Sequence, residues 1–325
     1  MIWVAWRQQR AQLIFLLVLL VAGYAAMLLL RGSMQTDLAG LGGCATESAV
    51  SGPCVTRVSS FKDSWYDLLK AAEAFVLVLP VLLGMFCAAP LIAKELEHGT
   101  HLLAFTQSVG RTRWMLSKFA VAAVPALVVL LALQQGAVSW VDAAGRLGPL
   151  DSGPFEWTTF GSSGVAPVSY LLFCLAFGMT AGALARRSLV AMFTTLVTFV
   201  VLRVLLGSAH GMLAGTQRLV SDDPAKSPGS ETAAQYVESG YLNAQGQEIT
   251  VEAAQPQISA CGSRGGAPLA GDLTACYRDH GLVKSYLDVV PSSAAASVHW
   301  AEAAVFAVLA VLSLPVCRWA LHRRP

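Results

Sequence analysis

The chain has 325 residues, of which 55% are apolar and 13% are charged, and its formal net charge is +2. Soluble domains hold about 45–50% apolar and about 25% charged residues, so this composition leaves too little polar surface for a soluble protein. The apolar residues also gather into runs close to the roughly 17 to 25 residues that a helix needs to cross a bilayer. The composition therefore predicts an all-α polytopic membrane protein.

Six apolar segments qualify as membrane spans. The first is too long for a cleavable signal peptide, and no A-x-A cleavage site follows it. The sixth is the shortest, and we expect its helix to begin near Ser297. The six predicted spans are residues 12–30, 71–93, 119–141, 167–185, 189–206 and 301–316.

The amino terminus, "MIWVAWRQQRAQ", places Ile2, Trp3 and Trp6 beside Arg7 and Arg10. This pattern predicts a short amphipathic helix in the membrane interface. The alternative is an ordinary basic flank anchored by tryptophan. Residues 31–70, rich in Gly, Ser and Thr, are predicted to form an outer loop, and so are residues 142–166, which carry turn signals throughout.

Residues 92–119, "IAKELEHGTHLLAFTQSVGRTRWMLSKF", hold an unusual group of acidic and imidazole side chains between the second and third spans. Glu95, Glu97, His98 and His101 suggest a metal site. However, the H-E-x-x-H pattern of zinc proteases needs histidines four apart with Glu after the first. Here the histidines are three apart, and Gly99 interrupts the helix at a cost of about 1 kcal/mol. A solvated charged loop and a coupling element for a cytoplasmic partner are the two other interpretations.

Polar groups within the predicted spans are the next candidates. Exposing the Gln134 and Gln135 amides to lipid would cost free energy, so we expect both side chains to face other helices or a cavity. In such a position they are candidate pathway residues. Arg203 lies about 23 Å along its helix from the inner end of the fifth span, so an anchoring role at the outer interface is expected. Gly178 and Gly182 form a small-xxx-small pattern typical of close helix packing.

The longest segment outside the predicted spans is 207–296, which we expect to form a small extracellular domain. Its start, "SAHGMLAGTQRLV", is weakly amphipathic and predicts a short helix, whereas "GYLNAQGQEITV" predicts a β-hairpin. The expected divisions are therefore residues 1–206 with five spans and a coupling loop at 94–118, the domain at 207–296, and residues 297–325 with the sixth span and a basic tail.

The distribution of Lys and Arg predicts the orientation, because cytoplasmic loops are enriched in both. With the amino terminus in the cytoplasm, the inside segments hold eleven of the 22 Lys and Arg residues but only two of the 20 Asp and Glu residues. Both termini are then cytoplasmic. The inside basic residues are Arg7, Arg10, Lys94, Arg111, Arg113, Lys118, Arg186, Arg187, Arg318, Arg323 and Arg324.

The cysteines give independent support for this orientation. Cys44, Cys54, Cys261 and Cys276 all fall in segments assigned to the outside, where disulfides persist. Four cysteines permit three connectivities, and the short separations favour Cys44–Cys54 and Cys261–Cys276. Four unpaired small residues are the alternative.

The loop "AKELEHGTHLLAFTQSVGRTRWMLSK" resembles the E-x-E-x-G-T…K loop of ABC-type exporter permeases of the type-2 class, in particular an actinobacterial-type branch. Residues 172–203, "LFCLAFGMTAGALARRSLVAMFTTLVTFVVLR", are similar to the fourth and fifth spans of that branch. The resemblance implies a type V exporter fold with a coupling helix after the second span. The residues that it implies for coupling to an ATPase are Glu95, Glu97, His98, Gly99, Thr100, Arg111 and Arg113.

The resemblance also implies a dimer of permease subunits, homomeric or heteromeric, that works with two ATPase subunits. The chain contains no Gly-Lys pair, so it cannot form a P-loop. ATP and Mg²⁺ would thus be bound by the partner P-loop ATPase, with no cofactor and no catalytic or metal site in this chain.

The resulting hypothesis is a permease of a bacterial plasma membrane that exports a drug, lipid or hydrophobic peptide, with no nucleic-acid partner. Two other hypotheses stay open. One is an integral-membrane metal-dependent enzyme whose site contains His98 and His101. The other is a membrane sensor or assembly protein that displays residues 207–296.

Overall fold

The computed structural model describes residues 10–45, 52–97, 110–228, 235–261 and 273–323, which form two compact units. The larger, called here the membrane unit, contains Met1–Ser152, Glu156–Gly207 and His299–Pro325. The smaller, called here the small unit, contains Gly153–Phe155 and Ser208–Val298. The amphipathic helix predicted at the amino terminus falls largely outside the described residues.

Within the described ranges, six helices are long and apolar enough to cross a membrane, and each contains one of the six predicted spans. The second of them is built from two helices joined by a π-helical turn, η2 (Gly84–Ala88). The six are α2 (Arg10–Leu41), α3 (Pro53–Leu83) with α4 (Ala89–Glu97), α6 (Arg111–Ala144), α8 (Ala166–Ala185), α9 (Ser188–Ser208) and α13 (Ala295–Arg323).

The outer loop predicted at residues 31–70 is wrong, because most of it is helical. Helix α2 runs to Leu41, the 3-10 turn η1 (Gly42–Ala45) follows, and α3 begins at Pro53. At about 1.5 Å per residue, the 44 helical residues Cys54–Glu97 are about 66 Å long, against about 30 Å for a bilayer core. The disulfide Cys44–Cys54 joins α3 to η1.

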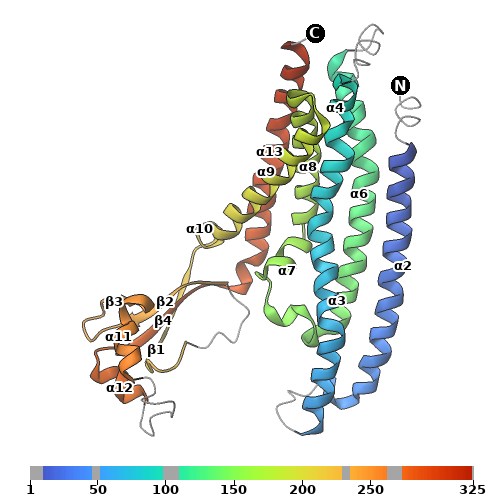
Figure 1. Cartoon of the computed structure of the whole chain (residues 1–325). Helices are drawn as coiled ribbons and strands as arrows, with labels where there is room; N and C mark the ends of the chain where they lie inside the picture. Colours follow the sequence, from blue (N-terminus) through green and yellow to red (C-terminus); the bar gives the residue numbers. More distant parts are fainter. Residues whose placement is uncertain (1–9, 46–51, 98–109, 229–234, 262–272, 324–325) are drawn as a thin grey trace. The chain divides into compact units, whose positions relative to one another are not determined.

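Side-chain packing explains these extensions. Met27, Met34 and Leu41 are spaced seven apart on α2 and are all buried. Phe61, Trp65 and Leu69 recur every four residues on α3, and they share one apolar cluster with the α2 residues. Buried stripes of this kind stabilise a helix more than the weak propensities of Gly, Ser and Thr destabilise it. Figure 1 shows α2, α3 and α6 side by side.

The change from α3 to α4 has a local cause. Pro80 lies inside α3 and cannot donate the usual backbone hydrogen bond. The π-helical turn η2 follows within the next turn of the helix, and π-turns are frequent at functional positions. There Gly84 lies against α8, because a Cβ on it would be 2.5 Å from the Cβ of Cys174.

Helix α8 approaches α4 through the predicted small-residue pattern. A Cβ on Gly178 would lie 3.1 Å from the carbonyl oxygen of Gly84. A Cβ on Gly182 would lie 2.6 Å from the carbonyl oxygen of Ala89, a distance that real Cβ atoms do not adopt. The close-packing role predicted for these two glycines is therefore confirmed, and their partner is the η2–α4 segment.

The segment predicted as a second outer loop, 142–166, contains short helices rather than turns alone. Two 3-10 turns, η3 (Gly145–Leu147) and η4 (Pro149–Ser152), follow the end of α6. The short helix α7 (Trp157–Ser162) then packs against α3 and α8. Thr159, Phe160, Gly161 and Ser162 of α7 are buried, so this segment is part of the core of the membrane unit.

The small unit is built on a four-stranded antiparallel sheet in the order β1-β4-β2-β3 (Figure 1). Its strands are β1 (Gln217–Ser221), β2 (Gln235–Leu242), β3 (Glu248–Thr250) and β4 (Lys284–Val290). In the described part of this unit, the helices α10 (His210–Ala214), α11 (Val251–Cys261) and α12 (Leu273–Asp279) accompany them, and the 3-10 turn η5 (Ser292–Ala294) precedes α13.

The β2–β3 hairpin confirms one local prediction in this segment. The helix predicted for residues 208–220 is confirmed only for His210–Ala214, because Gln217–Ser221 forms strand β1. In the hairpin, Leu242 pairs with Glu248, and the turn between them needs Gly246 at a φ of 75°. The predicted all-α fold class is wrong for the small unit, because this unit contains a β-sheet. Two of its strands, β1 and β4, were not predicted. Six of the seven β4 residues are buried, and a strand buried on both faces lacks the polar–apolar alternation that identifies strands in sequence.

Candidate functional site

The acidic segment that the sequence singled out forms the end of α4. Glu95 makes an ion pair with Lys118 of α6, and only 7% of the Lys118 side chain and 18% of the Glu95 side chain are exposed. The Lys118 ammonium also lies 4.7 Å from the centre of the Trp114 ring. Burial strengthens the attraction between the two charges, so Glu95 holds α4 against α6.

Glu97, two residues further on, is exposed instead. Its Oε2 accepts a hydrogen bond of 3.1 Å from the Ser188 hydroxyl at the start of α9. Arg113, on the first turn of α6, is exposed as well, and Arg111 begins that helix. His98, Gly99, Thr100 and His101 lie outside the described residues. The structure therefore brings Glu95 and Glu97 into contact with α6 and α9 respectively.

The two candidate pathway residues point in different directions. Gln134 is 4% exposed, and its Nε2 donates a 2.8 Å hydrogen bond to the carbonyl oxygen of Gly164. Gln135 is on an exposed face of α6. Gln134 thus contacts another segment of the membrane unit, whereas Gln135 lies on a different face, because neighbouring positions on one helix point about 100° apart. That the two are pathway residues stays a prediction.

A charged cluster around α7 was not anticipated. Glu156 precedes α7 and caps it, since its carboxylate accepts hydrogen bonds from the backbone amides of Thr158 at 3.1 Å and Thr159 at 3.0 Å. Lys70 of α3 lies 2.6 Å from Glu156 and 3.2 Å from Glu73. Glu73, 3% exposed, also accepts hydrogen bonds from the Thr158 and Thr159 hydroxyls. Two carboxylates and one ammonium thus fix the first turn of α7 to α3.

The Glu156 cap makes stability depend on pH. Burial by itself would raise the pKa of the Glu156 carboxyl, but hydrogen bonds from Lys70, Thr158 and Thr159 lower it from 4.5 to about 2. A pKa below that of the unfolded chain means that ionised Glu156 stabilises the fold above about pH 4.5, and that this contribution is lost as the pH falls towards about 2. We expect Glu156→Gln to lower the Tm of the detergent-solubilised protein by about 2–4 °C at neutral pH, the shift expected for about 1 kcal/mol.

That difference from the wild type should shrink as the pH falls below about 4.5, because the wild-type carboxylate is then progressively protonated. Intrinsic fluorescence during heating measures both Tm values. Asp63→Asn, at an exposed carboxylate on α3, is the matched control and should leave Tm unchanged. A Glu156→Gln deficit that is the same at all these pH values would contradict the assignment.

A second buried charge cluster joins three spans. Arg203 of α9 is 2% exposed and Glu302 of α13 is 0% exposed, and Nη1 of Arg203 lies 3.6 Å from Oε1 of Glu302. The Tyr170 hydroxyl of α8 donates a 2.5 Å hydrogen bond to the same carboxylate oxygen. Nη2 of Arg203 donates to the Trp157 carbonyl oxygen of α7 at 3.5 Å, and its guanidinium lies 4.2 Å from the centre of the Trp157 ring.

Arg203 is therefore not the interfacial anchor that its position predicts. The side chain does not extend along the helix to the membrane surface, because the Glu302 carboxylate and aromatic rings surround it within the membrane unit. Glu73 and Glu302 were not predicted as site residues, although they lie at the ends of the predicted spans 71–93 and 301–316. Charged residues in or beside spans are uncommon unless they are paired. This rule alone would have identified Glu73 and Glu302 as candidates for ion pairs.

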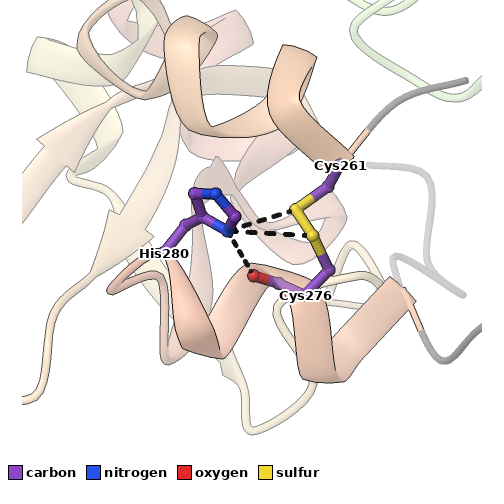
Figure 2. Close-up of side chains that lie close together, drawn as sticks. All are labelled: Cys261, Cys276 and His280. Carbon is purple, nitrogen blue, oxygen red and sulfur yellow. Dashed lines mark hydrogen bonds between the residues drawn. A yellow bond between two sulfur atoms is a disulfide. The ribbon is translucent and has the colours of Figure 1, made fainter. Parts of the chain in front are cut away.

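A metal centre has one candidate in the part of the chain that the structure describes. Cys261, Cys276 and His280 place three ligand-type atoms within 4.8 Å of one another. However, the two cysteines form a disulfide (Figure 2). Nδ1 of His280 lies 2.9 Å from the carbonyl oxygen of Cys276. Metals bind thiolates, so the cluster as it stands is a disulfide between α11 and α12 with a histidine packed on it.

Six membrane-length helices, with charges paired inside them, define an integral membrane protein of the multi-pass class. Residues 17–210 match the model of the family described as ABC-2 membrane transporter related. The match covers more than half of the chain and includes the α4 segment and α7, so the chain belongs to this family. No curated protein and no solved structure matches the chain.

Membership supports an ABC-2 type permease, which is the membrane subunit of a transporter and not an enzyme by itself. It also implies association with an ATPase subunit.

Proposed function

We propose that this chain is the permease subunit of an ATP-driven exporter in a bacterial plasma membrane. It moves a hydrophobic or amphipathic substrate outward, with a separate P-loop ATPase on the cytoplasmic face and a second permease subunit beside it. The family match supports the transport class. The observation that carries the finer proposal is the exposed Glu97 at the end of α4, directly before the segment that resembles a coupling loop.

The orientation rests on charge and on disulfides. Lys94, Arg113 and Arg187 lie at the ends of α4, α6 and α9 that are proposed to be cytoplasmic, as the bias of basic residues towards inside loops requires. Cys44–Cys54 and Cys261–Cys276 both lie in segments proposed to be outside, where an oxidising environment keeps disulfides formed. In this orientation the small unit is extracellular, and both termini are cytoplasmic.

The mechanism that fits these contacts is alternating access driven by closure of the ATPases. Glu97 gives a charged contact at the exposed end of α4, and the buried Glu95–Lys118 pair passes a push on α4 to α6. The hydrogen bond between Glu97 and Ser188 connects the same point to α9. Movement of α4 thus changes the position of the spans on either side of a central apolar pathway.

Two other functions are weaker. A metal-dependent enzyme would need His98 and His101, which lie outside the described residues. Of the two carboxylates that precede them, Glu95 is paired with Lys118 and Glu97 accepts a hydrogen bond from Ser188. A sensor or assembly protein would use the small unit, but the family match covers the first five membrane-length helices and ends at residue 210.

The test is recovery of an ATPase with the tagged full-length chain from its native membrane, measured as vanadate-sensitive ATP hydrolysis in the purified sample. Loss of one member of a desolvated charge pair costs about 2–5 kcal/mol, so Glu97→Ala should reduce the recovered activity more than about tenfold. Glu95→Ala should reduce it as well, together with the Tm, because Lys118 is then left buried without its carboxylate.

Ser188→Ala is the matched control for Glu97→Ala. It removes the 3.1 Å hydrogen bond but keeps the exposed carboxylate, so it should retain the ATPase. Full recovery of ATPase with Glu97→Ala would overturn the coupling role. Equal loss with Ser188→Ala would show that Glu97 only fixes α4 to α9.

A further inference from the structure

A cavity of about 330 Å³ opens beside the Glu95–Lys118 pair. Its walls come from the start of α2, from η2 and α4, and from α6. The volume falls within the range of about 300–1,000 Å³ that is usual for ligand pockets. The established family and the proposed coupling role do not account for this cavity.

The cavity is apolar on one side and cationic on the other. Phe86, Pro90 and Leu91 form the apolar side, and the Phe86 side chain is 59% exposed. Lys94, Lys118, the Glu95 carboxylate and the Gln12 amide form the polar side. Lys118 is already paired with Glu95, whereas Lys94 is exposed and has no ion-pair or hydrogen-bond partner among the described residues. The lining therefore offers one uncompensated ammonium next to an apolar wall.

We propose that this cavity binds the headgroup of an anionic phospholipid from the cytoplasmic leaflet. The phosphate would pair with Lys94 and accept a hydrogen bond from Gln12, and the first methylenes of the acyl chains would lie along Phe86 and Leu91. Basic pockets between spans on the cytoplasmic side favour anionic lipids. The placement of this end of α4 at the inner leaflet rests on the proposed function.

Such a lipid would act on coupling, because its phosphate would lie next to the ion pair that holds α4 against α6. A second anion close to Lys118 competes with Glu95 for the same ammonium. Anionic lipid would therefore change the strength of the Glu95–Lys118 ion pair between α4 and α6. This pair lies where the ATPase is proposed to act. A free soluble anion would use the lysine but not the apolar wall.

The test measures lipid binding to the purified full-length chain in detergent, with fluorescent phosphatidylglycerol and phosphatidylcholine of equal chain length. One lysine beside a membrane surface is worth about 1 kcal/mol towards anionic lipid, which is about fivefold in affinity. Wild type should prefer phosphatidylglycerol by about fivefold, and Lys94→Gln should abolish that preference. Arg187→Gln, an exposed basic residue at the start of α9 and outside the cavity lining, should behave as wild type.

A second variant separates the cavity from the surface around it. Ala11→Trp places a large side chain in the cavity wall and should weaken the binding of both lipids. Equal effects of Lys94→Gln and Arg187→Gln would overturn the proposal, as would normal binding by Ala11→Trp. Competition by glycerol 3-phosphate as strong as that by the lipid would overturn the assignment to a lipid. No ATPase is present in this measurement, so its failure is distinct from failure of the coupling test.

Discussion

Replacing Glu302 by Ala is expected to destabilise the membrane unit by about 3–5 kcal/mol, the usual cost of leaving a buried charge without its partner. Arg203 is 2% exposed, and the Glu302 carboxylate lies 3.6 Å from its Nη1 atom. Nε of Arg203 has no hydrogen-bond partner among the residues that the structure describes, so the guanidinium depends strongly on this carboxylate. The Tm in detergent and the monodisperse fraction in gel filtration should both fall.

The double variant Arg203→Leu, Glu302→Leu tests the cause. Replacing a buried ion pair by apolar residues is often neutral or stabilising, so the double variant should regain most of the lost Tm. The exposed pair Lys62–Asp151, with side chains 41% and 59% exposed, is the matched control, and Asp151→Ala should cost no more than about 1 kcal/mol. A double variant as unstable as Glu302→Ala would show that volume at these sites, and not charge, determines the loss.

Gly182→Ala is expected to have a comparably large effect for a steric reason. The added methyl would lie 2.6 Å from the Ala89 carbonyl oxygen and 3.3 Å from the Ala93 amide nitrogen. Backbone atoms cannot move aside as a flexible side chain does, so α8 and α4 must separate and lose contact along their interface. Overpacking of this kind costs about 1–3 kcal/mol and occasionally more. We expect a lower Tm and weaker ATPase recovery, since α4 carries Glu97.

Gly32→Ala is the matched control on α2, where a Cβ would meet nothing within 4 Å. Alanine favours a helix over glycine by about 1 kcal/mol, so this variant should be neutral or slightly stabilising. If both substitutions gave the same Tm, the close approach of α8 and α4 would not matter for stability.

The six spans could be predicted because apolar runs of bilayer length are rare outside membrane-spanning helices. The helical extensions of α2 and α3 were missed because Gly, Ser and Thr suggested a loop, although the seven-residue spacing of Met27, Met34 and Leu41 was already visible in the sequence. Helix α7 could not be predicted, since its six residues are held by Lys70 and Glu73, more than eighty positions away.

The candidate site, like the fold, could be predicted only in part. Glu95 and Glu97 could be identified because acids are rare near these spans. Only their contacts, with Lys118 of α6 and Ser188 of α9, show that Glu95 is largely buried and Glu97 exposed. Arg203 was misjudged because its partner Glu302 is about a hundred residues away in the sequence. A pairing of that separation depends on the arrangement of the helices, which no local pattern contains.

The contact of Gly84 with Cys174 divides the continuous second span into two unequal arms. From Gly84 to Glu97 the helix is about 20 Å long, whereas from Gly84 back to Cys54 it is about 45 Å. A rigid helix that pivots at Gly84 moves the end of its long arm about twice as far as the end of its short arm. If the span moved in this way under the proposed mechanism, a displacement of about 1 Å at Glu97 would become about 2 Å at the Cys44–Cys54 bond, which joins η1 to α3.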